Sequence, residues 1–257
     1  MVHTARHPKP GETLLGHGGE ITAGGKGANQ AVAAALLGTP VTFVGAVGSD
    51  AYAAPAMHYL KASGVNLEHV ARTDEVTGLA VITVDEQGEN TIIVVPGANA
   101  LVDAPFVTTH SSPITESELV LLQGEIPAEG FAKAIELATG RIVINLAPVI
   151  AVDKDALLRA DPLLANEHEA GLILEEFGLS AKGTPEELAQ RLRDAGFASV
   201  VLTLGARGAL VTEGTDLVAV PSPQVTPVDT TGAGDAFAGA LCARLLKGDS
   251  LVEAARY

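Results

Sequence analysis

The chain has 257 residues, of which 47% are hydrophobic and 18% are charged, and its formal net charge is −15. This composition is typical of a globular protein with one large or two small domains, and it excludes a disordered chain. The acidic balance argues against a broad surface for nucleic acid or anionic membranes, although it also serves solubility.

Three features of the sequence predict a cytoplasmic protein. The first residues, MVHTARHPKPGE, contain no apolar segment of the kind found in signal peptides. No apolar stretch is long enough to span a bilayer. The single cysteine, Cys242, excludes a framework of internal disulfides.

Strand-like and helix-like segments alternate along the chain. We expect strands at 41–47, 118–125, 141–148 and 199–205, and helices at 50–64, 127–140 and 184–197. The last of these helices carries its own start signal, with Thr184 as cap, Pro185 at the first position and Glu187 completing a capping box. Continuous Val, Ile and Leu strands separated by helices predict a parallel sheet covered on both faces.

Two regions interrupt this alternation and contain no helix. Residues 11–25 have short apolar pieces between glycines, and residues 77–99 read as two strands around a Gln-Gly turn. We expect them to form a small antiparallel sheet that stands off the main layers of one domain, residues 1–257. A second hairpin, at 208–220, is expected to extend the main sheet.

The stretch DTTGAGDAFAGAL places Gly232, Ala233 and Gly234 directly before a buried apolar helix that begins at Asp235. The first N–H groups of a helix lack intrahelical partners, and glycines let a ligand approach them, which suits a transferring phosphoryl group. The Asp235 carboxylate is placed to take a proton from an attacking hydroxyl. Taken alone, the pattern is equally that of a tight turn with an acidic residue stabilising its helix.

A second glycine-rich segment, AGGKGANQAVAAALLG, runs from residue 23 to residue 38 into an Ala- and Leu-rich helix. Its spacing is neither that of a P-loop nor G-x-G-x-x-G, so a dinucleotide fold has no direct support. Lys26 and Asn29 lie among small residues, which suits a pocket where ammonium and amide groups bind the hydroxyls of a sugar-like ligand. The alternative is an ordinary helix start.

Further polar residues follow the expected strands, where ligands bind in open α/β sheets. Glu125 ends one strand, Asn166 ends another and is followed by Glu169, and Arg207 lies in a glycine-rich turn after a third. Each has an ordinary structural explanation as well: Asn166 as a helix cap, Glu169 as a first-turn charge and Arg207 as a turn cation.

With these motifs in this order, the sequence resembles the ribokinase (pfkB carbohydrate kinase) family from about residue 8 to its end. The motifs are PGE (10–12), GGKGANQAVAAA (24–35), VGAVGSDAY (44–52), GEN...PGAN (88–99), ANEHEA (165–170), TLGARG (203–208) and DTTGAGDAFAGAL (229–241). The resemblance implies a three-layer α/β/α fold with a mainly parallel sheet and a small antiparallel β lid, formed by about 11–25 and 77–99. It also implies ATP-dependent phosphorylation of D-ribose at the 5-hydroxyl.

The resemblance implies roles for individual residues. Asp235 would be the general base, and Gly232, Ala233 and Gly234 would form the anion hole. The implied sugar contacts are Gly25, Lys26, Gly27, Ala28, Asn29, Glu125 and Asp235. The implied ATP contacts are Asn166, Thr203, Leu204, Gly205, Ala206, Arg207, Gly208 and Gly234. For metals, it implies Mg²⁺ near Glu169 through water, and a monovalent cation, K⁺, at Asp229 and the Thr231 carbonyl.

The resemblance also implies a cytoplasmic homodimer joined through the lid, with neither nucleic acid nor membrane as partner. Two departures stand against the family pattern: the chain begins after the first strand, which in the family ends in Asn-x-Asp, and it stops at Tyr257 before the last elements of the nucleotide and cation sites. We therefore expect the sequence to be an incomplete version of its protein. The alternatives are another kinase of the family, acting on fructose, deoxyribose or a nucleoside, and a non-catalytic relative that binds sugar or nucleotide.

Overall fold

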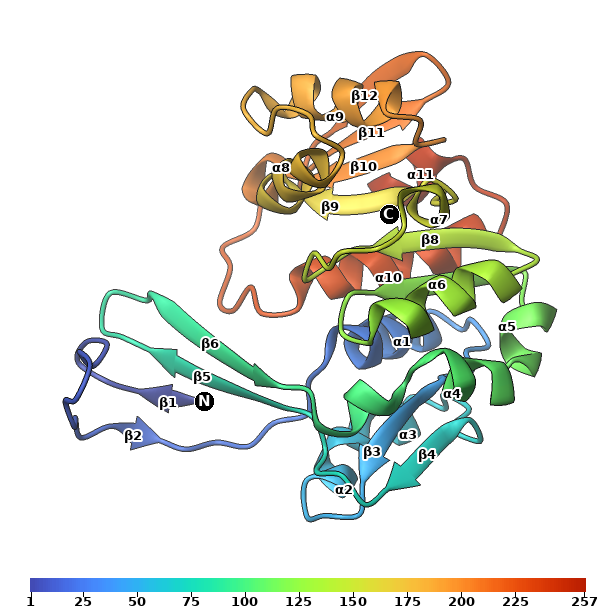
Figure 1. Ribbon diagram of the computed structural model, residues 1–257. Helices are drawn as coiled ribbons and strands as arrows, with labels where there is room; N and C mark the ends of the chain where they lie inside the picture. Colours follow the sequence, from blue (N-terminus) through green and yellow to red (C-terminus); the bar gives the residue numbers. More distant parts are fainter.

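The computed structural model describes all residues from Met1 to Tyr257 and arranges them as three layers with a small sheet standing off to one side (Figure 1). The main sheet has six strands in the order β12-β11-β10-β9-β8-β7. They are β7 (Leu119–Gln123), β8 (Arg141–Asn145), β9 (Leu163–Asn166), β10 (Val200–Thr203), β11 (Ala209–Glu213) and β12 (Asp216–Val220). Strands β7 to β10 are parallel, and β11 and β12 add an antiparallel hairpin, so both predictions about this sheet are confirmed.

Helices cover both faces of the main sheet because its strands send alternate apolar side chains into two cores. Ile144 and Leu163 belong to the larger core, whereas Val143 and Leu164 belong to the smaller one. The helices over the larger core are α4 (Ala104–Thr109), α5 (Ser112–Glu116), α6 (Ala128–Leu137), α7 (Lys154–Leu157), α8 (Glu167–Glu176) and α9 (Pro185–Asp194). The helices α10 (Ala233–Leu245) and α11 (Leu251–Arg256) cover the smaller core. The predicted three-layer architecture is confirmed, and none of these helices combines the length and apolarity needed to cross a membrane.

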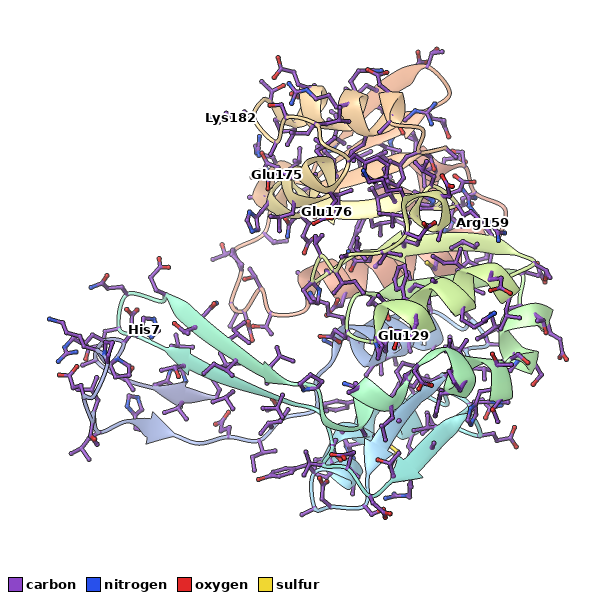
Figure 2. All side chains as sticks on the ribbon, viewed as in Figure 1. His7, Glu129, Arg159, Glu175, Glu176 and Lys182 are labelled. Carbon is purple, nitrogen blue, oxygen red and sulfur yellow. The ribbon has the colours of Figure 1, made fainter.

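Local polar contacts fix the ends of the outer helices. The predicted capping box of α9 is present, since the Thr184 hydroxyl accepts from the N–H of Glu187 and the Glu187 carboxylate accepts from the N–H of Thr184. At the end of α6, the Arg159 guanidinium donates to the carbonyls of Ile135 and Ala138 (Figure 2). These contacts supply partners for backbone groups that a helix end leaves unpaired.

Two predictions near the N-terminal third are only partly right. The expected strand 41–47 is replaced by a shorter and later one, β3 (Gly45–Gly48). It pairs in parallel with β4 (Val70–Thr73) in a separate two-stranded sheet. The expected helix 50–64 is divided at Met57 into α2 (Ala53–Ala56) and α3 (His58–Ala62). At Met57 the backbone has φ of −89° and ψ of 0°, which ends α2 and precedes α3; Pro55 lies in the first turn of α2, where its missing N–H removes no helical hydrogen bond.

The small sheet that stands off the core has the strand order β2-β1-β5-β6. Its strands are β1 (Val2–His3), β2 (His17–Gly18), β5 (Leu79–Val84) and β6 (Asn90–Val95). The hairpin within 77–99 is confirmed. The expectation of an antiparallel sheet from 11–25 and 77–99 alone is wrong in two respects: β1 is inserted between the two regions, and it runs parallel to β5. A two-residue strand has too few positions to show a periodic pattern in the sequence.

The root of this lid is attached to the loop after β3. The backbone N–H of Thr77 donates to Asp50 at 2.7 Å, and the Thr77 hydroxyl donates to the same carboxylate at 2.8 Å. These bonds, the backbone one above all, hold the pKa of Asp50 below its ordinary value. A Cβ at Gly48 would lie 2.4 Å from the carbonyl oxygen of Glu75, so only glycine permits this approach.

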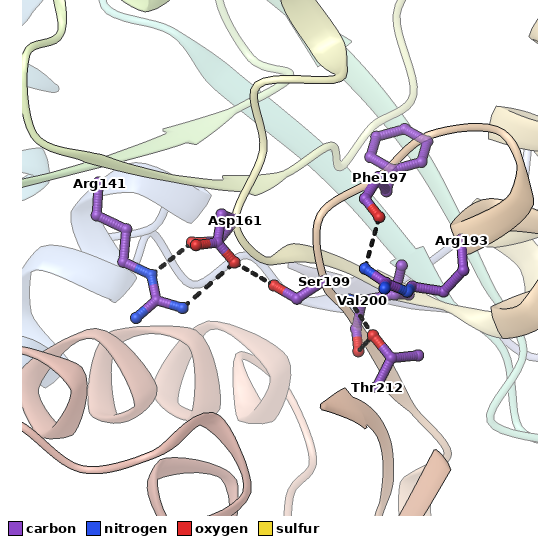
Figure 3. A network of polar contacts seen from close by, with 7 residues as sticks. All are labelled: Arg141, Asp161, Arg193, Phe197, Ser199, Val200 and Thr212. Carbon is purple, nitrogen blue, oxygen red and sulfur yellow. Dashed lines mark hydrogen bonds and ion pairs between the residues drawn. The ribbon is translucent and has the colours of Figure 1, made fainter. Parts of the chain in front are cut away.

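At the opposite end of the main sheet, a polar network joins the amino ends of β8, β9 and β10 (Figure 3). The Arg141 guanidinium donates to the Asp161 carbonyl at 2.7 Å and forms an ion pair with its carboxylate, which also accepts from the Ser199 hydroxyl. Beside it, the Thr212 hydroxyl accepts from the N–H of Val200. The amino ends of the strands are thus tied to one another, whereas their carboxyl ends face the cleft described below.

Helix α1 (Lys26–Leu36) packs backbone to backbone against α10. A Cβ built on Gly239 would lie 2.4 Å from the carbonyl oxygen of Gln30 and 2.7 Å from the Cβ of Ala33. The missing side chain of Gly239 is therefore what allows the two helices, and the glycine-rich loops that precede them, to meet.

We expect Gly239→Ala to lower the free energy of unfolding by about 1–3 kcal/mol, because the added methyl group must displace a backbone carbonyl. Chemical denaturation measures this directly. The matched control is Gly171→Ala in α8, where the nearest atom to the added Cβ is the side-chain methyl of Ala181 at 3.3 Å; there the helix propensity of alanine offsets the contact, and stability should stay within about 1 kcal/mol of the parent. Equal stability of the two variants would contradict the close contact of α1 and α10.

Candidate active site

Polar side chains end each of the four parallel strands of the main sheet. Gln123, Asn145, Asn166 and Thr203 are the last residues of β7, β8, β9 and β10, and the pairing register places Gln123 beside Asn145 and Asn166 beside Thr203. A cleft of about 230 Å³ opens at this edge. Its lining residues are Lys26, Asn145, Ala147, Leu164, Ala165, Asn166, Glu169, Thr203, Thr230, Gly232, Ala233, Gly234, Asp235 and Phe237.

The amino end of α10 forms one wall of this cleft. Gly232 caps the helix in the left-handed conformation, with φ of 72°, which favours glycine. The N–H of Ala233 donates to the Thr230 carbonyl at 3.1 Å, so it is engaged in the turn. The N–H groups of Gly234 and Asp235 have no partner within the protein. Two free donors at the positive end of a helix dipole make this wall suited to an anion.

Asp235 is 7% exposed and is held by two amide side chains of α1. Its Oδ2 accepts from the Asn29 amide at 2.8 Å, and its Oδ1 accepts from the Gln30 amide at 3.0 Å. The contacts join residues more than 200 positions apart in the chain, since the separations are 206 and 205. The two glycine-rich motifs of the sequence therefore meet at one carboxylate.

The amino end of α1 also lies close to Asp235. Gly25 caps this helix with φ of 97°, and the N–H of Lys26 donates to the Glu125 carboxylate at 2.8 Å. Burial raises the pKa of Glu125, the N–H and the charge of Lys26 oppose that rise, and the charge of Asp235 adds to it. A Cβ at Gly27 would lie 2.8 Å from Oε1 of Gln123, so the loop must be small here. The predicted residues 25 to 29, Glu125 and Asp235 are thus brought together.

Only some of the residues predicted to bind the nucleotide line the cleft. Asn166, Thr203 and Gly234 line the cleft. Residues 204–208 form a tight turn after β10, with the N–H of Leu204 donating to the Gly208 carbonyl at 2.8 Å, and they lie beyond the lining. Arg207 forms an ion pair with Glu167 at the start of α8. Asn166 and Glu169 form a capping box at the start of α8, so Asn166 is the helix cap and Glu169 the first-turn charge that the sequence also allowed. Both residues line the cleft as well.

The residues expected to hold metal ions fit that task to different degrees. No group of three or more His, Cys, Asp or Glu side chains is arranged to hold a metal ion. Glu169 lines the cleft and uses Oε2 to accept from the N–H of Asn166, which leaves its other oxygen for a water bound to Mg²⁺. The Asp229 carboxylate accepts from the N–H of Thr231 at 2.8 Å, and this bond lowers its pKa. An ionised carboxylate with one free oxygen suits a monovalent cation, but the remaining ligands would have to come from backbone carbonyls.

Several site residues were missed by the sequence interpretation. Gln30, Gln123 and Asn145 form a chain of amides behind Asp235, and the lining of the cleft also includes Ala147, Leu164, Ala165, Thr230 and Phe237. Asn145 carried a usable signal, because it is the one polar residue after Arg141 in the predicted strand 141–148. Gln30 gave only the weak signal of one amide in a helix of small apolar residues.

Comparison with known proteins gives a consistent result. The chain matches the pfkB family carbohydrate kinases over residues 2–257. It is 36% identical over 263 residues to the ribokinase of Bacillus subtilis, covering 100% of this chain and 85% of the relative. The crystal structure of ribokinase from Thermotoga maritima superposes with a TM-score of 0.90 at 32% identity, covering 99% of this chain and 84% of that one. The Arabidopsis thaliana ribokinase complexed with ribose and ATP gives a TM-score of 0.87 at 30% identity, covering 99% and 85%.

The raised pKa of Glu125 predicts how stability depends on pH. The folded protein holds this proton more tightly than the unfolded chain, so the favourable contribution is present below the ordinary pKa of glutamate and is lost as pH rises through the raised value. We expect Glu125→Gln to have little effect on the melting temperature near pH 4 and to raise it relative to the parent near pH 8. The control is Glu176→Gln, on an exposed carboxylate of α8 (Figure 2), which should show no such pH-dependent difference. A difference for Glu125→Gln that does not grow with pH would contradict the prediction.

Proposed function

We propose that this chain, which belongs to the pfkB family of carbohydrate kinases and is an ATP-dependent sugar kinase, phosphorylates D-ribose at its 5-hydroxyl. The observation that carries the proposal is the buried carboxylate of Asp235 beside the free N–H groups of Gly234 and of Asp235 itself. The names of the relatives support ribose as the sugar, and so does the relative whose structure contains ribose and ATP.

In the proposed reaction, Asp235 accepts the proton of the 5-hydroxyl as its oxygen attacks the γ-phosphorus of ATP. The new bond joins the sugar oxygen to phosphorus, and the bond between that phosphorus and the bridging oxygen of ADP breaks. The free N–H groups of Gly234 and Asp235 donate to the oxygens of the transferring phosphoryl group, with the dipole of α10 behind them. Gly232 and Ala233 shape the turn that keeps these donors exposed.

The sugar would lie against the amino end of α1. Lys26 and Asn29 offer an ammonium and an amide, Glu125 accepts from sugar hydroxyls, and the small residues Gly25, Gly27 and Ala28 let this loop pack closely against Glu125 and Gln123. Asn29 already donates to Asp235, so a hydroxyl that contacts Asn29 is brought next to the base. This arrangement supplies the orientation that a phosphoryl transfer needs.

The nucleotide would lie along the carboxyl ends of β9 and β10. Asn166 and Gly234 would contact its phosphates, and residues 203–208 would contact the rest of the nucleotide. When bound with ATP, Mg²⁺ neutralises charge on the phosphates, and Glu169 would hold it through water; Asp229 and the Thr231 carbonyl would contribute to a K⁺ site. Lys26 lines the same cleft and adds a local positive charge to a chain of net charge −15.

The lid supports a homodimer as the assembled form. All six residues of β6 are exposed, and β6 is an edge strand that pairs only with β5. Ile92 and Val94 point to one face of the lid and Ile93 to the other, and their exposed fractions are 51%, 59% and 62%. Exposed apolar side chains on an open strand edge are suited to a second copy of the chain. We place the enzyme in the cytoplasm, with small molecules rather than nucleic acid or membranes as its ligands.

A panel of sugars tests the proposed substrate. With ADP production measured by a coupled assay, we expect kcat/KM to be highest for D-ribose and lower for fructose, 2-deoxyribose and a nucleoside. A higher value for one of the other sugars would identify a sister activity of the family. Binding of ribose and an ATP analogue in calorimetry without any turnover would contradict the proposed reaction.

The role of Asp235 is tested by Asp235→Asn, which keeps the shape of the side chain and removes the base. We expect kcat to fall by ~10²–10⁴, while calorimetry shows nucleotide binding retained. The control is Asp216→Asn on β12, an exposed position remote from the cleft, which should leave kcat unchanged. If kcat of Asp235→Asn stays within a few-fold of the parent, Asp235 is a helix-start residue and not the base.

A further inference from the structure

We propose that Gln30 is a positioning residue for the reaction, and that Gln123 and Asn145 hold it in the one orientation in which it can position Asp235. The inference rests on the proposed function, because it concerns the carboxylate that acts there as base. Gln30 touches neither sugar nor nucleotide in the site described above. Its effect on the reaction is exerted through Asp235.

Gln30 is completely buried, with 0% of its surface exposed, in a helix whose other buried residues are alanines. Burial of an amide is costly unless all of its hydrogen-bonding groups find partners. Gln30 finds three: its Nε2 donates to Asp235 at 3.0 Å and to Asn145 at 2.9 Å, and its Oε1 accepts from Gln123 at 2.7 Å. One side chain of α1 therefore joins α10 with the ends of β7 and β8.

The direction of these hydrogen bonds is fixed at both ends. An ionised carboxylate only accepts, so Asp235 must face the Nε2 of Gln30, and Oε1 must then face the Nε2 of Gln123. At the other end, the carbonyl of Leu164 only accepts, and it receives the Nδ2 of Asn145 at 3.3 Å. Asn145 is left to present Oδ1 to Gln30. Reversal of any amide in the chain would place two acceptors or two donors against each other.

This fixed direction has a consequence for the reacting carboxylate. Gln30 holds Oδ1 of Asp235 from the buried side, whereas Asn29 holds Oδ2 where the contact is only partly buried. The two donors together restrict rotation of the carboxylate and leave Oδ2 as the oxygen nearer the cleft. The amide chain therefore fixes the orientation of the base.

The central variant is Gln30→Met, which keeps the length of the side chain and removes the donor. We expect kcat to fall by up to about 100-fold, the cost of a misplaced catalytic group, while KM for ribose and for ATP changes by less than a few-fold.

A second variant keeps the test valid if Gln30→Met does not fold. Gln123→Met removes the partner that orients Gln30 but leaves the Gln30–Asp235 contact possible, so kcat should fall less, by about 10-fold, again with KM for ribose and for ATP changed by less than a few-fold. The control for mere loss of a buried polar contact is Thr212→Val in β11, which is 4% exposed and remote from the cleft. It should lower the melting temperature and leave kcat and both KM values unchanged.

Parallel measurement of Asp235→Asn separates the two hypotheses. If Asp235→Asn retains near-parental kcat, the proposed function of Asp235 fails, and the positioning role fails with it. If Asp235→Asn loses activity as expected but Gln30→Met, or Gln123→Met where only that variant folds, keeps the parental kcat, the positioning role alone is overturned. A lower kcat with a KM that rises in proportion would also overturn it, because that result indicates a general distortion of the site.

Discussion

The close contact between the backbones of α1 and α10 is the constraint on which the site depends. Because Gly239 has no side chain, the helices approach until a Cβ there would lie 2.4 Å from the carbonyl of Gln30. At that separation the short amide of Asn29 and the longer amide of Gln30 both reach Asp235. A wider separation of the helices would first break the contact made by the shorter side chain, that of Asn29. Neither glycine-rich loop therefore forms the site alone, and the packing of two helices decides the geometry of the base.

The site gathers negative charge inside an acidic protein and stabilises it locally. Asp235 and Glu125 lie close enough for the charge of one to raise the pKa of the other, and the chain carries a net charge of −15. Free N–H groups at the start of α10, the N–H of Lys26 and the amides of α1 supply the compensating donors. Burial of Glu125 still leaves its ionised form disfavoured. A carboxylate kept at such a cost is typical of a residue retained for function and not for stability.

The fold followed from the sequence wherever the signal was local or periodic. Continuous apolar strands between helices gave the parallel sheet, and the Thr-Pro-x-Glu start gave the capping box of α9. The errors arose where a segment is too short to carry a pattern, as in β1, or where a local change of the backbone at Met57 divides a helix, as in α2 and α3. In the site, Asn29 and Glu125 were predicted to lie with Asp235, but Gln30, which also contacts Asp235, and the amides behind Gln30 were not. A single glutamine in an apolar helix looks like any exposed polar residue until its three partners are known, and those partners come from three separate elements.

The hydrogen bonds that hold Asp235 involve no residue of the lid. The amides that hold Asp235 belong to α1, β7 and β8, and none belongs to β1, β2, β5 or β6. The lid instead joins the core at three places: at Thr77, through Asp50; where β6 runs into residues 97–101; and along the chain that runs from β2 to Gly25. Gly24 has open space around its backbone and Gly25 has a positive φ, so this connection can change direction at little steric cost. The connection from β2 therefore ends on the Lys26 side of the cleft, where the sugar is proposed to bind, and it shares none of the hydrogen bonds that orient the base. A kinase gains from this division, because the sugar must enter and leave in every cycle while the base keeps one orientation.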